Sequence, residues 1–314
     1  VNRCSGATGY SRLKKSALAG LVVAAGLTLA AALNGCAKVD EPAAEPAPVG
    51  GPPLMRRLTE SQYRATVADI FSPEIPIAAR FERGMRTHGL LAIGTSEAGL
   101  SPFAIEQYDA AARSIAGAVV SETWRHQLVP CTPQNETDFD ATCAARFVAH
   151  YGPLLMRRSL SLAELQSYEA LALRGHEELG DFYEGLKFAL TGMLLAPDFL
   201  LRIEVAEQST NSAQLARLDN YSKATRLSYF LTNSTPDSEL LRAAEAGELE
   251  SRTGLVTQVD RLIASPGFEH ALRAFFEDML EFDLFDDLAK DPLIYPAFNS
   301  QVATDDGDQM PRTI

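Results

Sequence analysis

The sequence is poor in histidine, tryptophan and cysteine, and it lacks several motifs that carry known chemistry. Its 314 residues include five histidines, four cysteines and one tryptophan. No glycine-rich phosphate loop and no His-Glu-x-x-His motif occurs in it. Cys-x-x-Cys-His is absent as well, so this sequence cannot attach haem c covalently. The histidines lack the spacing of metal ligands, and we expect no metal site: His88, His126, His150, His176 and His270.

Positive charge is also scarce. Lys and Arg total 28 against 41 Asp and Glu, and the formal net charge is −13. A chain this acidic is not drawn by its charge to nucleic acid or to an anionic lipid surface, so we expect no nucleic-acid partner. Hydrophobic residues make up 46% of the chain, which is enough for a substantial core.

The first residues have the order of a secretory signal. Arg3, Arg12, Lys14 and Lys15 precede an apolar run from residue 17 to residue 33, and no acidic residue intervenes. A membrane-spanning helix is the competing interpretation, but it needs about 20 strongly apolar residues. This run is shorter and rich in Ala and Gly, so residues 1–35 are predicted to be a removed signal peptide.

A cysteine follows the apolar run directly. Leu33-Asn34-Gly35-Cys36 resembles the lipobox of bacterial lipoproteins, which implies lipidation of Cys36 after cleavage before it. The acyl chains would anchor the protein firmly, and Ala37 favours the outer membrane, on its periplasmic face or at the cell surface. An ordinary signal peptide with an incidental cysteine is the alternative. Residues 36–53, rich in Pro and Ala, would then form an extended tether.

Two further cysteines bracket a polar segment without helical periodicity. Cys131 and Cys143 enclose "TPQNETDFDAT", and an exported chain enters an oxidising compartment. We therefore predict a disulfide between them. A metal-binding pair is the alternative, although no nearby His or Cys completes such a site.

The rest of the chain predicts helices. Apolar residues recur at spacings of three and four, and no segment alternates convincingly as a strand would, so the expected fold is all-α, with helical modules packed into one or two domains. Capping boxes, which start helices, are predicted at Thr59/Gln62, Ser161/Glu164 and Asp181/Glu184. We expect helical modules at 54–124, 125–208 and 215–298, the last of them incomplete, and an irregular acidic tail at 299–314.

Several of these segments resemble a known family. They include "RRLTESQYRATVADIF", "FVAHYGPLLMRRSLSLAEL", "LLAPDFLLRIE" and "ATRLSYFLTNSTPDSELLRAAEAGEL". They are similar, in this order, to domains of unknown function numbered 1587, 1595 and 1592, which are common in secreted proteins of planctomycetes and myxobacteria. Two positions depart from the family: Ser159 stands where Pro is usual, and Thr232 where Trp is usual.

The resemblance implies a redox setting, because such proteins usually continue into modules that attach haem c. This chain ends at Ile314 and resembles a truncated member, so haem c would belong to a missing C-terminal part. The polar residues that the resemblance singles out are Arg57, Asp69, Arg202, Glu204, Arg226 and Asp237. They form either a shared binding cleft or structural pairs between modules.

These observations lead to one functional hypothesis and two alternatives. We expect a lipid-anchored protein that is accessory to a periplasmic or outer-membrane redox system, with a cytochrome or another envelope protein as its partner. A non-catalytic binding or scaffold lipoprotein is the alternative. A weaker alternative is an enzyme that acts on an extracellular polymer, so whether the chain catalyses a reaction stays open.

Overall fold

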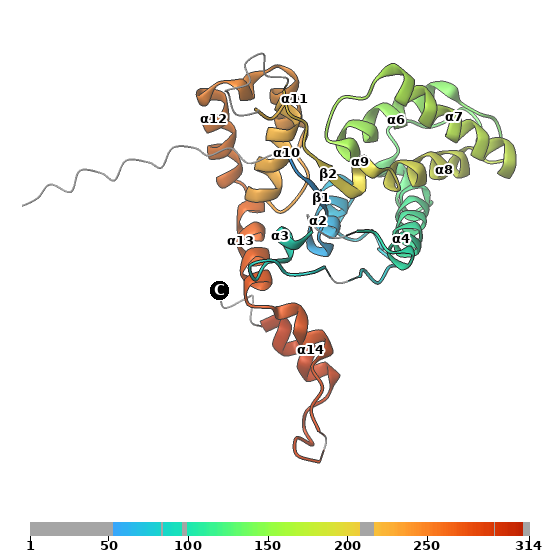
Figure 1. Ribbon diagram of the computed structural model, residues 1–314. Helices are drawn as coiled ribbons and strands as arrows, with labels where there is room; N and C mark the ends of the chain where they lie inside the picture. The colour runs from blue at the N-terminus through green and yellow to red at the C-terminus, as the bar shows by residue number, and fades with distance from the viewer. Residues whose placement is uncertain (1–52, 83, 96–98, 208–216, 292, 310–314) are drawn as a thin grey trace, which may run out of the picture. The chain divides into compact units, whose positions relative to one another are not determined.

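The computed structural model describes residues 53–82, 84–95, 99–207, 217–291 and 293–309 (Figure 1). The predicted signal peptide and Cys36 lie outside these ranges. The described α-helices, in chain order, are α2 (Glu60–Ile70), α3 (Leu91–Gly94), α4 (Pro102–Val120), α5 (Arg125–Leu128), α6 (Ala141–Met156), α7 (Leu162–Leu179), α8 (Phe182–Leu194), α9 (Pro197–Leu200), α10 (Asn220–Leu231), α11 (Ser238–Glu245), α12 (Arg252–Ile263), α13 (Pro266–Met279) and α14 (Ser300–Gln309). Two 3₁₀ helices, η1 (Glu248–Glu250) and η2 (Phe282–Asp287), connect some of them.

The all-α prediction is confirmed, with one addition. A two-stranded antiparallel ribbon pairs β1 (Met55–Arg57) with β2 (Leu201–Ile203). No sequence pattern indicated this ribbon, because strands of three residues are too short to show alternation. The ribbon joins two segments that lie far apart in the sequence.

Side-chain caps explain where the helices begin. Thr59 with Gln62 and Ser161 with Glu164 form the predicted capping boxes of α2 and α7. Asp181 accepts a hydrogen bond from the Glu184 amide and starts α8. The reciprocal bond predicted for that pair is not formed, because the Glu184 carboxylate accepts hydrogen bonds from Lys187 instead.

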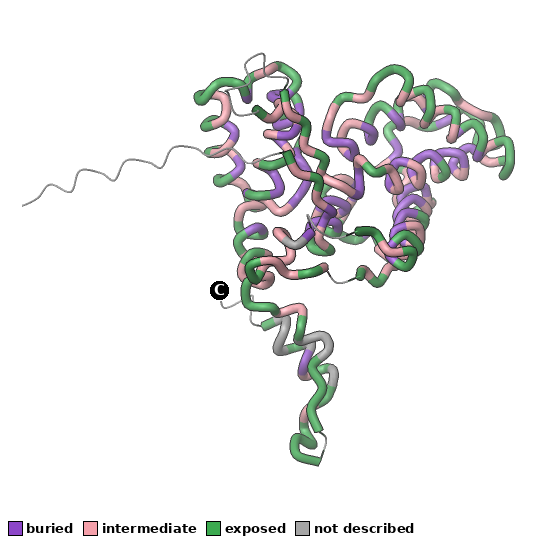
Figure 2. Tube along the Cα trace, in the orientation of Figure 1, coloured by how far each residue is buried: buried purple, intermediate pink, exposed green. Residues whose placement is uncertain are grey.

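The larger core lies among α4, α6, α7 and α8, which pack on one another. Its fully buried side chains include Ile115, Phe147 and Leu186, and Figure 2 shows buried positions along these helices. A Cβ atom at Gly185 would lie 2.5 Å from the carbonyl oxygen of Ala172. Glycine therefore allows the close approach of α7 and α8.

The predicted disulfide is confirmed. Cys131 and Cys143 are bonded, and they link the segment after α5 to the first turn of α6. Cys143 is itself buried against the larger core. The covalent link thus holds the polar loop between α5 and α6 against the helices.

A second cluster of buried residues lies among α10, α11 and α12. Leu231, Leu240 and Leu262 are buried there, and Tyr221 and Phe268 pack against the cluster from its edge. These side chains come from the apolar positions spaced three and four residues apart, as the sequence pattern predicts.

The prediction of an irregular tail at 299–314 is wrong for most of that segment, because helix α14 covers Ser300–Gln309. Its acidic residues and Gly307 obscured the helical pattern. Two contacts support the helix: the Val302 amide donates to Asn299 Oδ1 at 3.0 Å, and Ala303 is buried. Across the described residues, no helix combines the length and the apolar character that crossing a membrane requires.

Candidate functional site

The ribbon sets two arginines directly opposite each other. Arg56 of β1 faces Arg202 of β2 in the antiparallel register, so both side chains leave the ribbon on the same face. We call Arg56 and Arg202 the arginine pair. Like charges in this position repel each other and destabilise a ribbon.

Tyr229 of α10 lies beside the arginine pair and connects the modules. Its hydroxyl lies 3.0 Å from Thr66 Oγ1 of α2 and accepts a hydrogen bond from Arg157 Nη1 at 3.3 Å. The guanidinium carbon of Arg202 lies 5.0 Å from the centre of the Tyr229 ring, and that of Arg157 lies 5.8 Å from it. Both distances are those of cation–π contacts.

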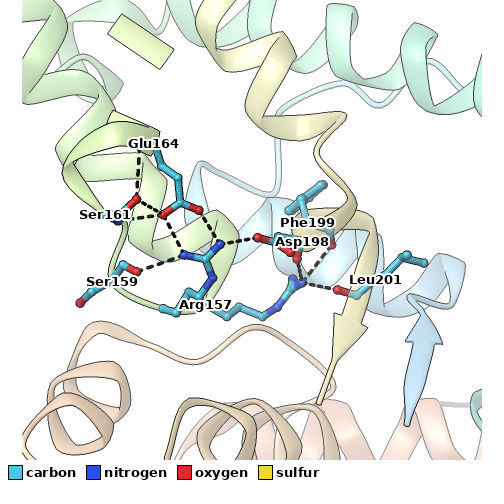
Figure 3. A network of polar contacts seen from close by, with 8 residues as sticks. Arg157, Ser159, Ser161, Glu164, Asp198, Phe199 and Leu201 are labelled. Atoms are coloured by element: carbon cyan, nitrogen blue, oxygen red, sulfur yellow. Dashed lines mark hydrogen bonds and ion pairs between the residues drawn. The ribbon is translucent and has the colours of Figure 1, made fainter. Parts of the chain in front are cut away.

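Arg157 is held by main-chain carbonyl groups. It follows the last turn of α6 with a left-handed backbone, at a φ of 57°, which is uncommon for a residue with a long side chain. Its Nη2 donates to the carbonyl oxygens of Asp198, Phe199 and Leu201 (Figure 3). The buried guanidinium thereby fixes the segment that leads from α9 into β2.

Arg158 extends this network by two ion pairs. Its guanidinium contacts the carboxylates of Glu164 and Asp198, at 2.7 Å for Glu164. The hydrogen bond from Arg158, with those from Ser161, lowers the pKa of Glu164 to about 2. The same carboxylate closes the capping box of α7, so Arg158 links the first turn of α7 to Asp198 of α9.

Glu204 and Arg226 join the ribbon to α10. Arg226 Nε and Nη2 donate to the two Glu204 carboxylate oxygens at 3.0 and 2.6 Å, and the Leu54 amide donates to Oε2 at 2.9 Å. Burial opposes ionisation of Glu204, but these hydrogen bonds outweigh it and hold the pKa of Glu204 below its usual range. The carboxylate is therefore already fully engaged.

The arginine pair has no such partner. The Nε atoms of Arg56 and Arg202 are buried and make no hydrogen bond, and neither guanidinium has an ion-pair partner among the described residues. As whole side chains, both residues are partly buried. Burial, with the charges of Arg56 and Arg157, lowers the pKa of Arg202 to about 10.

The residues singled out from the sequence do not form one cleft. Arg202, Glu204 and Arg226 come together around the ribbon and α10. Arg57 is buried, and its position in β1 sends it to the opposite face from Arg56. Asp69 is exposed on α2. Asp237 caps α11 and pairs with Arg261 at 2.6 Å.

Sequence reasoning did not single out Arg56, Arg157, Thr66 or Tyr229 as site residues. The only signal for the arginines was the presence of two Arg-Arg pairs, each shortly before a capped helix. Thr66 and Tyr229 are separated by 163 residues, and no local pattern shows a contact at that range.

A second surface, on α13 and η2, is apolar and exposed. Leu272, Phe275 and Met279 follow one face of α13 and keep 44%, 47% and 43% of their surface exposed, and Leu280 and Leu284 continue this surface at 47% each. We call these residues the α13 face. Their spacing indicates a stripe for packing, yet no described element covers it.

Acidic residues lie in the same stretch of chain as the α13 face. Glu269 pairs with Arg273 at 2.8 Å, whereas neither Glu277 nor Glu281 has an ion-pair partner among the described residues. Asp278 is engaged: it pairs with Arg86 and accepts hydrogen bonds from the amides of α3. The contact through Arg86 fixes the end of α13 against the loop before α3.

Within the described ranges, no group of three or more His, Cys, Asp or Glu side chains lies close enough to hold a metal ion.

The fold and contacts define an all-helical protein whose consecutive modules are tied together by arginine and tyrosine side chains. Family models match the modules in order: PSD3, protein of unknown function (DUF1587), at residues 56–121, PSD5, protein of unknown function (DUF1595), at 143–204, and PSD4, protein of unknown function (DUF1592), at 218–312. The chain belongs to the family that carries these three domains, as its motifs predicted. The third match runs past residue 298 into α14. No curated protein and no solved structure matches the chain.

Proposed function

We propose that this protein is an exported, lipid-anchored accessory protein that docks a basic redox partner, a c-type cytochrome, on its α13 face. The observation that carries the proposal is the exposed apolar stripe of Leu272, Phe275 and Met279 beside acidic residues without ion-pair partners. An apolar centre with a charged rim is typical of protein interfaces. The export signal and the cytochrome association are implied by the sequence resemblances.

Charge favours a basic partner. The chain has a net charge of −13, and Glu277 and Glu281 add local negative charge beside the apolar side chains. Complementary charge speeds the encounter of two proteins and fixes their orientation. A basic protein with an apolar contact patch is therefore the occupant that fits this surface.

The direct test is calorimetric titration of the full chain with a basic c-type cytochrome. We expect a dissociation constant in the micromolar range at low salt, weakening about tenfold or more at physiological ionic strength because salt screens the contact. Phe275→Ser should weaken binding about tenfold, and Glu277→Lys should weaken it further at low salt. Both side chains reach solvent, so folding should be retained.

Matched controls come from α7. Leu162 is 70% exposed there, and Glu177 is exposed on the same helix. Leu162→Ser and Glu177→Lys make the same chemical changes away from the α13 face and should leave binding unchanged. Equal losses in the α7 and α13 variants, or no binding at low salt, would contradict docking on the α13 face.

Titration with lysozyme, a basic protein without haem, distinguishes the redox-accessory function from the scaffold function. Preference for the cytochrome supports the redox-accessory function. Equal binding of both proteins through Phe275 overturns the redox assignment and supports the scaffold function.

A further inference from the structure

We infer that the arginine pair, Arg56 and Arg202, is a binding site for a phosphate-type oxyanion at the junction of the modules. This site is separate from the α13 face and does not depend on the docking proposal. The inference rests on the ribbon register, the unpartnered guanidinium groups and the local balance of charge.

The ribbon register makes the arginine pair destabilising to the folded state when no anion is bound. Arg56 and Arg202 are directly opposite in a ribbon of only three residues per strand. Their Nε atoms are buried without a hydrogen-bond partner, and a buried donor without a partner destabilises the folded state. A bound anion would relieve the repulsion and would offer acceptors to the outer Nη groups, which are not among the buried atoms without a partner.

The surrounding charge is positive despite the acidic chain. The arginine pair, Arg157 and Arg226 lie around one carboxylate, that of Glu204, which the Arg226 fork and the Leu54 amide already occupy. The pKa of Arg202 is lowered by burial and by its arginine neighbours. Glu204 and Tyr229 oppose this lowering of the Arg202 pKa without cancelling it, as expected where burial and like charges outweigh the nearby negative charge.

The geometry of the donors favours a tetrahedral oxyanion. Two neighbouring guanidinium groups each present a planar fork that matches phosphate or carboxylate oxygens. A phosphate offers enough oxygens for both forks and can carry two negative charges, whereas one carboxylate is saturated by a single fork, as Glu204 is by Arg226. Tyr229 lies against Arg202 and holds its guanidinium in place.

The test is thermal unfolding of the full chain in inorganic phosphate and in sodium chloride at equal ionic strength. We expect a saturable rise in melting temperature in phosphate alone. Glycerol 3-phosphate, used in parallel, tests a phosphate monoester. A response to either compound supports the site, and the stronger one shows whether the phosphate is free or borne by a larger molecule. Identical melting in phosphate, glycerol 3-phosphate and chloride would overturn it.

Arg56→Gln gives the sharper result, because it removes the repulsion together with the site. In chloride this variant should melt at or above the wild-type temperature, and in phosphate it should show no further rise. Phosphate binding followed by ³¹P line broadening should be at least about tenfold weaker in Arg56→Gln and in Arg202→Gln. Arg64→Gln, which removes an exposed arginine paired with Glu60, should keep the full response. Retention of that response by Arg56→Gln would overturn the proposal.

Discussion

Arg157 shows how a single side chain holds several segments together. Its guanidinium donates to main-chain carbonyl groups of α9 and of the first residue of β2, and to the hydroxyl of Tyr229. It does so from a left-handed backbone position, so the contacts offset a local conformational cost. Nη2 serves the carbonyl groups while Nη1 serves the Tyr229 hydroxyl, and the single nitrogen of a lysine cannot provide both arms.

Arg157→Lys should therefore lower the free energy of unfolding by about 2 kcal/mol or more, because carbonyl groups lose their partners in a buried setting. Urea denaturation followed by circular dichroism measures this. Arg64→Lys, at an exposed helix position, is the control and should change stability little. Equal denaturation midpoints for the two variants would show that the carbonyl contacts contribute nothing.

Unlike the Arg157 guanidinium, whose Nη atoms have acceptors, the hydroxyl of Tyr63 is buried without a hydrogen-bond partner. Burial, with a contribution from Tyr108, raises the pKa of Tyr63 well above the ordinary value of 10. The folded state thus keeps the neutral form, and stability falls once the pH rises above about 10, where the unfolded chain ionises.

Tyr63→Phe should be neutral or stabilising at pH 7, and it should retain more of its stability than wild type between about pH 10 and 11. Urea midpoints across that range test this. Greater loss of stability in the variant than in wild type would mean that the hydroxyl has a partner in solution.

At the scale of elements, the helices were predictable and the ribbon was not. Helix starts follow from local rules, such as the capping boxes of α2 and α7, and the apolar stripes follow from spacing. The ribbon depends on contacts between residues about 150 apart in the chain, such as Leu54 with Glu204. The arginine pair could not be predicted for the same reason. Arg56 and Arg202 share a face only after the two distant strands have paired.

The disulfide is the element-scale feature with the largest predicted effect. Cys131 and Cys143 close a short loop, with a sequence separation of 12. Replacing both with Ser should lower the free energy of unfolding by about 3 kcal/mol, mainly because the unfolded chain regains freedom. Chemical denaturation with and without reductant tests this, and wild type in reductant should match the variant. Free thiols at both positions in oxidised protein would contradict the link.

At the scale of the whole molecule, side chains of different modules contact one another directly. Thr66 meets Tyr229, Asn233 donates to Ser61 Oγ at 2.7 Å, and Ser159 contacts Tyr221 at 2.9 Å. The hydroxyl of Ser159 supplies this last contact. These hydroxyl and amide side chains thus join the first and second modules to the third.

The predicted lipid anchor is tested at the same scale. Cys36→Ser removes the thiol that would be acylated, so the protein should leave the membrane fraction or accumulate as an uncut precursor. Fractionation and intact mass measure both outcomes. Cys4→Ser is the control and should behave as wild type, because Cys4 lies within the predicted signal peptide. Unchanged fractionation and mass in Cys36→Ser would contradict the anchor.

The most direct test of the docking proposal is hydrogen–deuterium exchange of the full chain with and without a basic c-type cytochrome at low salt. The account predicts slower exchange in the peptides that cover α13 and η2, with the effect lost in 0.5 M salt, where charges about 4 Å or more apart are screened. Unchanged exchange in those peptides, or protection confined to α7 and α8, would contradict the assignment of the α13 face as the docking surface.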